Sequence, residues 1–199
     1  WGLDFDVTPD VLVPRPETEL IIEAVCEHRG NRASVRTIVD VGTGSGCLAI
    51  SLAREFPDAR VVATDISAAA LAVAARNALR HGVDQRVTFV RGDLLEPVQG
   101  PVDVIVSNPP YVPAGVELSP DIVRFEPSVA LYSGHDGLTL VKRLVGCAAS
   151  RLAPDGLFVT EFGFGQDDEV IACARAAGWS DVATKEDFQG IPRVAAMRK

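Results

Sequence analysis

The sequence of 199 residues has little methionine, histidine or tyrosine, and it lacks a long apolar run. It contains one methionine, three histidines and two tyrosines. No apolar stretch approaches the roughly 20 residues that a membrane-spanning helix needs, and no signal peptide is visible. We therefore expect a cytoplasmic protein with no membrane partner.

Cysteine is also scarce, and its spacing excludes the usual zinc and disulfide patterns. The four cysteines are scattered, without a C-x-x-C pair, so we expect reduced and mostly buried thiols. They are Cys26, Cys47, Cys147 and Cys173. The histidines (His28, His81 and His135) stand apart from every motif, which favours surface or helix-end positions over catalysis. No metal site is predicted.

Positive charge is the third shortage. Lysine and arginine number 19 against 27 acidic residues, which gives a net charge of −8 and a sequence pI near 4.9. Surfaces dedicated to nucleic acid need clustered lysine and arginine, so we expect no direct nucleic-acid binding. The apolar fraction of 47% in a chain of this length predicts one domain with a full core.

Alternating apolar segments separated by helical patterns predict an α/β fold. Strands are expected at 37–41, 60–65, 87–90, 102–107, 157–162, 182–186 and 194–197, and helices at 17–28, 47–56, 68–79, 137–152 and 166–177. Five β-then-α units and a closing antiparallel hairpin predict a doubly wound, mostly parallel sheet of seven strands. Before this unit, residues 1–13 alternate loosely and predict a hairpin that turns at Thr8-Pro9-Asp10.

A glycine loop follows the first predicted strand. Gly42, Thr43, Gly44, Ser45 and Gly46 form a G-x-G-x-G pattern, in which glycines let the backbone turn sharply and approach a ligand. The dinucleotide fingerprint needs its last glycine at the position of Cys47. The spacing therefore favours S-adenosylmethionine (SAM), which has no pyrophosphate to bind.

Acidic residues follow the next two predicted strands. Asp65 comes about 20 residues after the glycine loop, where a carboxylate can accept hydrogen bonds from both ribose hydroxyls. The alternative role is to cap the helix that begins near Ser67. Asp93 is placed for an adenine amino group and the Leu94 backbone for a ring nitrogen, with a plain Gly-Asp turn as the alternative.

The strand at 102–107 leads into Asn108-Pro109-Pro110-Tyr111, which is the predicted catalytic turn. Two prolines fix φ and remove two backbone donors, so the turn offers mainly acceptors, the Asn108 side-chain oxygen and the Pro109 carbonyl. Such a pair can hold the two N–H groups of an NH2 group, with Tyr111 against its plane. Because ligands bind beyond the carboxyl ends of the strands in such sheets, we expect this turn and the glycine loop at the same edge.

Two further segments are open to more than one interpretation. Arg15 follows Pro14 and is either a pocket residue or a solvated side chain. Residues 113–132 are polar and contain several prolines, and a loop of this length in a compact domain is usually a lid or a partner surface.

Four motifs together resemble HemK/PrmC, the release-factor glutamine methyltransferases, over essentially the whole chain. They are Val13–Glu19 (VPRPETE), Asp40–Gly46 (DVGTGSG), Ser107–Tyr111 (SNPPY) and Phe125–Pro127 (FEP). The resemblance implies a class I SAM-dependent methyltransferase that modifies the glutamine of the Gly-Gly-Gln motif in peptide chain release factors. It implies that Gly42–Gly46 line the methionine moiety, that Asp65 binds the ribose and that Leu94 lies by the adenine, with Asn108–Tyr111 at the glutamine amide.

The same resemblance implies a helical N-terminal domain that recognises the factor and is missing here. We accordingly predict a hairpin or linker remnant over 1–16 and the methyltransferase domain over 17–199. The chain departs from the family at Phe162, where isoleucine is usual, and at Ile191, where arginine is usual.

Three rival functions remain open from the sequence. An N6-adenine or other exocyclic-amine methyltransferase acting on nucleic acid can use the same turn on a flipped base. A nicotinamide-dependent oxidoreductase would bind NAD in place of SAM, and a non-catalytic module would bind SAM without transferring its methyl group.

Overall fold

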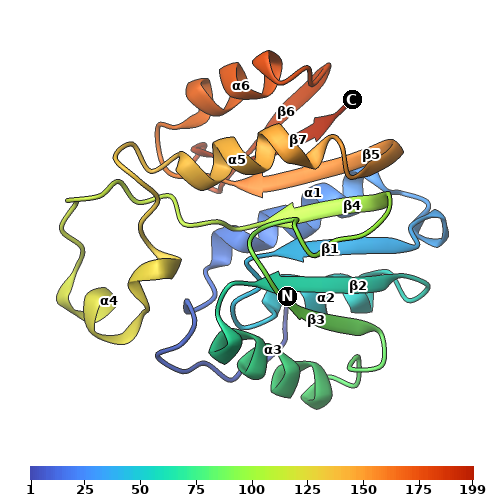
Figure 1. Cartoon of the computed structure of the whole chain (residues 1–199), viewed down its shortest axis with the longest axis horizontal. Helices are drawn as coiled ribbons and strands as arrows, with labels where there is room; N and C mark the ends of the chain where they lie inside the picture. Colours follow the sequence, from blue (N-terminus) through green and yellow to red (C-terminus); the bar gives the residue numbers. More distant parts are fainter.

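The computed structural model describes residues 1–199 and has one seven-stranded sheet (Figure 1). The strand order is β3-β2-β1-β4-β5-β7-β6. The first five strands in this order are parallel, and β7 is antiparallel to both β5 and β6. The strands are β1 (Thr37–Val41), β2 (Arg60–Asp65), β3 (Val87–Arg91), β4 (Val102–Ser107), β5 (Leu152–Glu161), β6 (Asp181–Glu186) and β7 (Pro192–Arg198). The predicted sheet, including its closing antiparallel hairpin, is confirmed.

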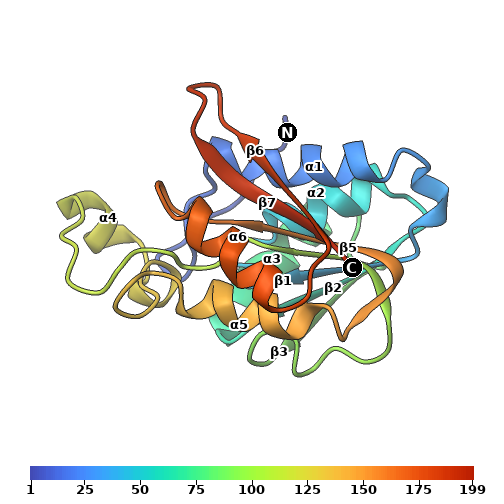
Figure 2. The same cartoon turned by 90° about the horizontal axis from the view of Figure 1, so that it is seen from above.

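Helices cover both faces of this sheet. They are α1 (Glu19–His28), α2 (Cys47–Glu55), α3 (Ala68–Arg80), α4 (Pro120–Phe125), α5 (Thr139–Ala148) and α6 (Asp167–Ala176). The view from above shows α1 and α2 on one side of the sheet and α5 and α6 on the other (Figure 2). Successive strand residues point to opposite faces, so Ile38 packs in the core under α1 and α2 while Val39 packs in the core under α5. The longest helix, α3, has 13 residues, so none of the helices could span a bilayer.

The strand register brings three chain segments together at the carboxyl edge. Val41 at the end of β1 is the partner of Ser107 at the end of β4, and Ser107 is in turn the partner of Thr160 near the end of β5. The Ser107 hydroxyl also donates to the Val41 carbonyl over 2.8 Å. The glycine loop, the Asn-Pro-Pro-Tyr turn and Glu161 therefore leave the sheet side by side, as predicted for the first two.

The predicted hairpin over residues 1–13 is wrong. The turn exists, since the Val11 N–H donates to the Thr8 carbonyl, but no strand forms on either side of it. The backbone of this segment forms hydrogen bonds with a helix side chain instead. Asn77 of α3 donates to the Asp6 carbonyl and accepts from the Asp6 N–H, each over 2.9 Å. A buried side-chain amide thus replaces the partner strand.

The structure has four β-then-α units in place of the predicted five, because no helix follows β3. Residues 92–101 connect β3 to β4 through turns, and Leu95 and Val98 bury their side chains in the core below α5. The helix predicted over 137–152 is shorter, because α5 ends at Ala148 and β5 already begins at Leu152, opposite Val102.

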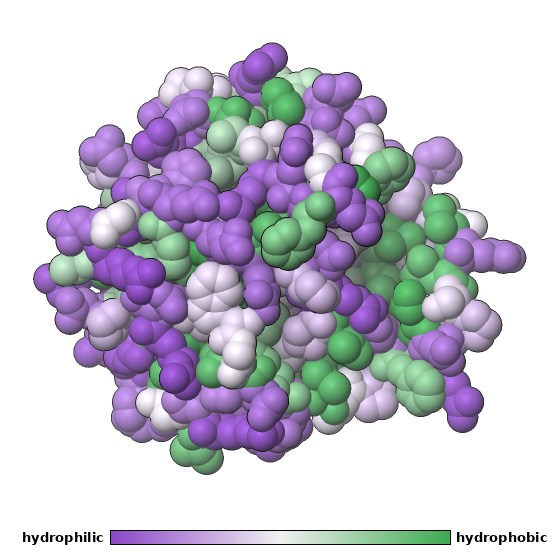
Figure 3. All heavy atoms as spheres, turned by 180° about the vertical axis from the view of Figure 1, so that it is seen from behind, coloured by the Kyte–Doolittle hydropathy of each residue, from purple (hydrophilic) through white to green (hydrophobic).

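Residues 113–135 form a lobe beyond the carboxyl ends of the strands, which both ribbon views show at the left (Figures 1 and 2). The lobe contains α4 and a short 3₁₀ turn, Ser128–Ala130. Apolar side chains gather on it and around the hollow beside it (Figure 3), and Val123, Phe125 and Val129 are exposed. Exposed apolar surface of this kind is typical of a binding region.

The scarce thiols and imidazoles do not line the cavity described below, with one exception. All four cysteines are free and half-buried rather than fully buried, and Cys47 alone contributes to the cavity described below. His28 ends α1, His81 caps the carboxyl end of α3, and His135 is exposed. The histidines therefore take the predicted surface and helix-end positions.

Candidate active site

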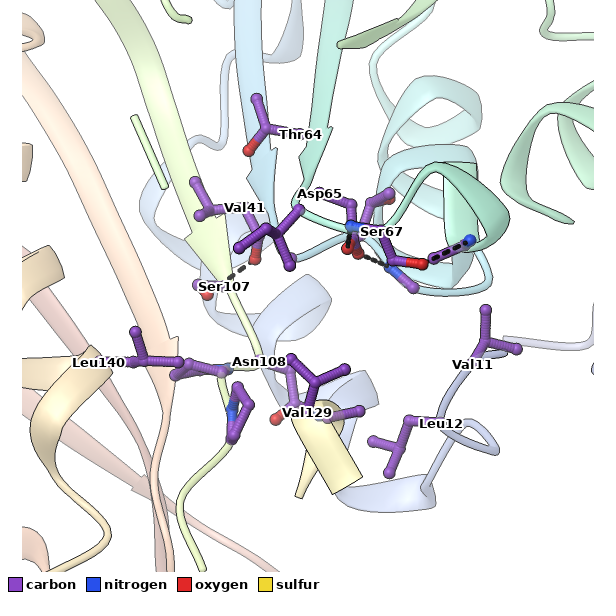
Figure 4. Close-up of a pocket in the computed structure, with 18 of the residues that line it drawn as sticks. Val11, Leu12, Val41, Thr64, Asp65, Ser67, Ser107, Asn108, Val129 and Leu140 are labelled. Carbon is purple, nitrogen blue, oxygen red and sulfur yellow. Dashed lines mark hydrogen bonds between the residues drawn. The ribbon is translucent and has the colours of Figure 1, made fainter. Parts of the chain in front are cut away.

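A cavity of about 310 Å³ opens at the carboxyl edge of the sheet (Figure 4). Val11 and Leu12 of the N-terminal segment form one wall, and Val129 and Ala130 of the lobe contribute to another. The cavity brings together most of the predicted site residues, namely Gly42, Thr43, Gly44, Ser45, Asp65, Asp93, Leu94, Asn108, Pro109 and Pro110. Gly46 and Tyr111 lie outside its lining.

The glycine loop takes a left-handed backbone at Gly42 and Gly44, with φ of 71° and 55°. A Cβ at either position would meet nothing within 4 Å, so these glycines leave free space in the cavity wall. Gly46 has a different task. Its Cβ would lie 3.1 Å from the Ala74 Cβ, which means that this glycine lets α2 approach α3. Sequence spacing could not separate these two uses of glycine.

Asp40 holds the loop from beneath. Its carboxylate accepts from the Thr43 hydroxyl over 2.7 Å and from the Ala49 N–H over 3.0 Å. Burial raises the pKa of Asp40 to about 7, because these two hydrogen bonds do not compensate for lost hydration. The loop is therefore fixed to the start of α2 by a fully buried carboxyl.

Asp65 supports both the glycine loop and the residue that caps α3, but it is not itself the cap, and its ribose role stays a prediction. One carboxylate oxygen accepts from the Gly44 N–H over 3.0 Å and the other from the Ser67 N–H over 2.8 Å. Ser67 is the helix cap, since its side chain accepts from the Ala70 N–H. Each Asp65 oxygen keeps a second lone pair, so the carboxylate can still accept from two ribose hydroxyls.

The turn after β3 presents a donor to the cavity. Leu94 has a left-handed φ of 49°, and its carbonyl accepts from the Thr64 hydroxyl over 3.0 Å. Its N–H donates to no protein group, which suits a ring nitrogen as predicted. Asp93 is less free than predicted, because Arg143 holds both of its oxygens, at 2.6 and 3.3 Å.

The Asn-Pro-Pro-Tyr turn presents the two predicted acceptors. The Asn108 side-chain NH2 donates to the Thr18 hydroxyl over 2.8 Å. Neither the Asn108 side-chain oxygen nor the Pro109 carbonyl accepts a hydrogen bond from the protein. Two unpaired acceptors on neighbouring residues thus line the cavity.

Glu161 joins this turn to the N-terminal segment. The carboxylate is 1% exposed and accepts from the Thr18 hydroxyl over 3.0 Å and from the Tyr111 hydroxyl over 3.1 Å. Burial is the largest influence on it and raises its pKa to about 7. Burial and the neighbouring Glu161 carboxylate also raise the pKa of Tyr111. The hydroxyl of Tyr111 therefore stays protonated and acts as a donor inside the protein.

Gln166 fixes the other side of the turn. Its side-chain NH2 donates to the Tyr111 carbonyl over 3.1 Å, and its oxygen accepts from the Gly163 N–H over 2.8 Å. A Cβ at Gly163 would lie 3.1 Å from the Tyr111 ring. Tyr111 is therefore confined by packing and hydrogen bonds, not placed across the cavity.

Arg15 neither lines the cavity nor is simply solvated. It forms an ion pair with Glu126, which is buried in the lobe. Pro127, next to Glu126, lines the cavity. The pair therefore ties the N-terminal segment to the lobe beside the site.

Sequence reasoning missed four residues that organise the site: Thr18, Asn77, Glu161 and Gln166. Asn77 also donates to the Ser45 carbonyl over 2.8 Å and so supports the glycine loop from α3. Two signals were available. Glu161 is a charged residue that directly follows Leu157–Thr160 in a mainly apolar stretch, and Thr18 stands in the VPRPETE motif. Neither signal reveals which partners the side chain would meet.

The fit to SAM follows from this geometry. The cavity offers glycines with free space, a carboxylate for ribose hydroxyls and a free N–H for a ring nitrogen, with no pyrophosphate pattern. Residues 16–125 match the family described as "Methyltransferase small domain". The N-terminal domain of human METTL16, solved in complex with SAH, is 17% identical with a TM-score of 0.67, covering 98% of this chain and 75% of that one. The fold and the site define a class I SAM-dependent methyltransferase domain.

Two curated relatives narrow this class. A release factor glutamine methyltransferase of Geobacter sulfurreducens is 44% identical over 200 residues, covering 99% of this chain. One of Moorella thermoacetica is 49% identical over 179 residues, covering 89% of this chain. The chain spans 69% and 63% of the lengths of these relatives. The chain belongs to the release factor glutamine methyltransferase family, as its motifs predicted.

Proposed function

We propose that this chain transfers the methyl group of SAM to the side-chain amide nitrogen of the glutamine in the Gly-Gly-Gln motif of peptide chain release factors. The observation that supports this most is the pair of unpaired acceptors, the Asn108 oxygen and the Pro109 carbonyl, beside the cavity. A primary amide has two N–H donors in one plane, which this pair can accept. The names of the relatives agree with this substrate.

An amide nitrogen is a weak nucleophile because its lone pair is shared with the carbonyl. Asn108 and Pro109 accept hydrogen bonds from both N–H groups, which orients the nitrogen and stabilises the positive charge that develops there. SAM, when bound, supplies an electrophilic methyl group on a sulfonium. With the amide held by Asn108 and Pro109, transfer would form the bond from the nitrogen to the methyl carbon as the carbon–sulfur bond of SAM breaks, and the neutral thioether would leave. The N-methyl amide then loses one proton, which needs no strong base, and this agrees with the absence of histidine from the cavity.

Gly42–Ser45, Asp65 and Leu94 would hold the cofactor in the proposed complex. Asp65 accepts from the ribose, the Leu94 N–H faces the adenine ring, and Asp93 accepts from the adenine amino group while Arg143 holds it. The lobe over 113–135, through its exposed apolar side chains, would contact the protein substrate. We also propose that the protein acts in the cytoplasm, where release factors work.

Labelled methyl transfer tests this proposal. We expect purified release factor to take up one methyl group from labelled SAM, and peptide mapping should place it on the glutamine of Gly-Gly-Gln. A factor with alanine in place of that glutamine is the control and should remain unlabelled. Duplex DNA or RNA should also remain unlabelled. Label on nucleic acid, with none on the factor, would establish the exocyclic-amine alternative instead.

A further inference from the structure

The hydroxyl of Thr18 lies between two other side chains and makes one hydrogen bond of each kind. It donates its single proton to Glu161 over 3.0 Å and accepts from the Asn108 NH2 over 2.8 Å. Thr18 precedes α1, Asn108 follows β4 and Glu161 ends β5, so three distant segments meet at one oxygen. Both Thr18 and Glu161 are buried, which leaves water little room to replace these contacts.

We propose that Glu161 is a positioning residue that sets the orientation of the Asn108 amide through Thr18. This inference rests on the proposed function. An ionised carboxylate only accepts hydrogen bonds, so it takes the Thr18 proton and leaves the Thr18 oxygen as an acceptor. That oxygen then attracts the NH2 end of the Asn108 amide. The oxygen of Asn108 is thereby turned towards the cavity, where the glutamine NH2 would lie.

The reverse arrangement shows why the charge on Glu161 matters. A proton on the Glu161 oxygen that faces Thr18 would make this oxygen a donor. The Thr18 proton would then be free to turn to Asn108 and to favour the amide oxygen on that side. The Asn108 NH2 would face the cavity, and donors would meet the donors of the substrate amide. Asn108 could then no longer accept a hydrogen bond from the substrate amide, although the backbone would not have moved.

The surroundings of Glu161 make this proton exchange accessible near neutral pH. No cation contacts the carboxylate, and both of its oxygens accept only from hydroxyls, those of Thr18 and Tyr111. The charged groups that face it are Glu17 before α1, which raises its pKa, and Arg193 of β7, which lowers it. Burial outweighs these effects and raises the pKa of Glu161 to about 7. Turnover at saturating SAM should therefore fall as the pH drops through about 7.

Thr18→Val provides the first test, with purified release factor as the substrate. The variant removes the hydroxyl and keeps the shape. We expect kcat to fall roughly 10- to 100-fold, as for loss of a buried polar contact, with SAM affinity and the KM for the factor within about threefold of wild type. Thr18→Ser keeps the hydroxyl and should restore kcat. Thr160→Val is the matched control, because Thr160 is a buried threonine on β5 that bonds only to the Glu161 backbone.

Glu161→Gln provides the second test. The glutamine side chain has an accepting oxygen and a donating NH2 group. It can therefore either accept from the Thr18 hydroxyl or donate to it. We expect kcat roughly tenfold below the wild-type maximum, and the same at pH 6 and pH 8, because glutamine does not titrate. Thermal unfolding and SAM titration should show that the variant is folded and binds the cofactor.

The protons of the Asn108 amide give a readout that needs no substrate. We expect slow exchange of the Asn108 NH2 in wild type at pH 8, faster exchange in Thr18→Val, and assignment by the disappearance of the signal in Asn108→Ala. Wild-type turnover in both Thr18→Val and Glu161→Gln, or equal exchange in all forms, would overturn the positioning role and leave the proposed function intact. Failure of wild type to methylate any factor would overturn the proposed function, while the exchange data would still decide how Asn108 is held.

Discussion

The cofactor half and the acceptor half of this site are each built on one buried carboxyl, but they differ in how far apart the partners lie in the chain. Asp40 binds Thr43 and Ala49, which are 3 and 9 residues away. Glu161 binds Tyr111 and Thr18, which are 50 and 143 residues away. The contacts that Asp40 makes to the glycine loop are thus local, within one strand–loop–helix unit. The acceptor half exists only when three distant segments have met.

This difference has a functional meaning. The cofactor half makes many contacts through backbone groups, and one lost side chain leaves the others in place. The acceptor half presents two oxygens, and only one of them belongs to a side chain that can be mutated. Changes in the acceptor half should therefore affect turnover, and changes in the cofactor half should affect affinity for SAM.

Asn108→Ala should have the largest effect, and this effect should be on turnover and not on SAM affinity. The substitution removes one of the two acceptors, and we expect kcat to decrease by roughly two to three orders of magnitude, as for other catalytic hydrogen-bond groups. SAM affinity, measured by calorimetry, should remain near that of wild type. Asn31→Ala, at an exposed asparagine, is the control. A variant with wild-type turnover would exclude the acceptor mechanism.

Asp65→Ala should show the opposite behaviour. It removes the acceptor for the ribose and leaves the N–H groups of Gly44 and Ser67 without their partner. We expect SAM to bind roughly 10- to 100-fold more weakly, while kcat at saturating SAM changes little. Asp58→Ala, at an exposed aspartate, should bind SAM normally. A loss confined to kcat would remove the distinction between the two halves.

The stability of the protein should rise on mild acidification, with one contribution from each half. The pKa values of Asp40 and Glu161 are raised to about 7 from ordinary values of 3.8 and 4.5. Between the ordinary pKa values and pH 7, the folded state binds more protons than the unfolded state. The stability that the two carboxyls contribute is therefore complete below their ordinary pKa values and is lost as the pH rises through about 7. We expect the free energy of unfolding to be larger at pH 5.5 than at pH 8 by roughly 2–4 kcal/mol.

Denaturant titration at pH 5.5 and pH 8 measures this difference in unfolding free energy. Two variants separate the contribution of Asp40 from that of Glu161. Asp40→Asn and Glu161→Gln should each flatten the pH dependence in part, and the double variant should flatten it further. If neither substitution alters the dependence, the two carboxyls do not ionise as their burial requires.

Arg143→Ala should have the smallest effect. Arg143 and Asp93 form an exposed pair, and exposed ion pairs contribute little. We expect SAM affinity to fall by less than about fivefold, with kcat unchanged. Lys142→Ala is a suitable control, because its side chain pairs with Asp136 outside the cavity. A large loss of affinity would mean that the position of Asp93 depends on this arginine.

The same division explains what could be predicted from the sequence. Apolar runs, glycines and prolines determine backbone, and they were sufficient for the seven strands, the carboxyl edge and the two facing loops. The roles of Thr18 and Glu161 were missed because side-chain partners depend on tertiary register, such as the pairing of Ser107 with Thr160. The N-terminal hairpin was wrong for a related reason. Its alternating pattern is satisfied by a helix, through Asn77, and sequence periodicity does not identify the partner.

The contacts of the N-terminal segment with α3 and with the cavity have a practical consequence. Asn77 holds Asp6 and the Ser45 carbonyl at once, and a few residues later Val11 and Leu12 form a cavity wall. A shortened version that starts at Glu17 would retain all seven strands and still lack one side of its cofactor chamber. A minimal catalyst should therefore keep the chain from Asp6 onwards.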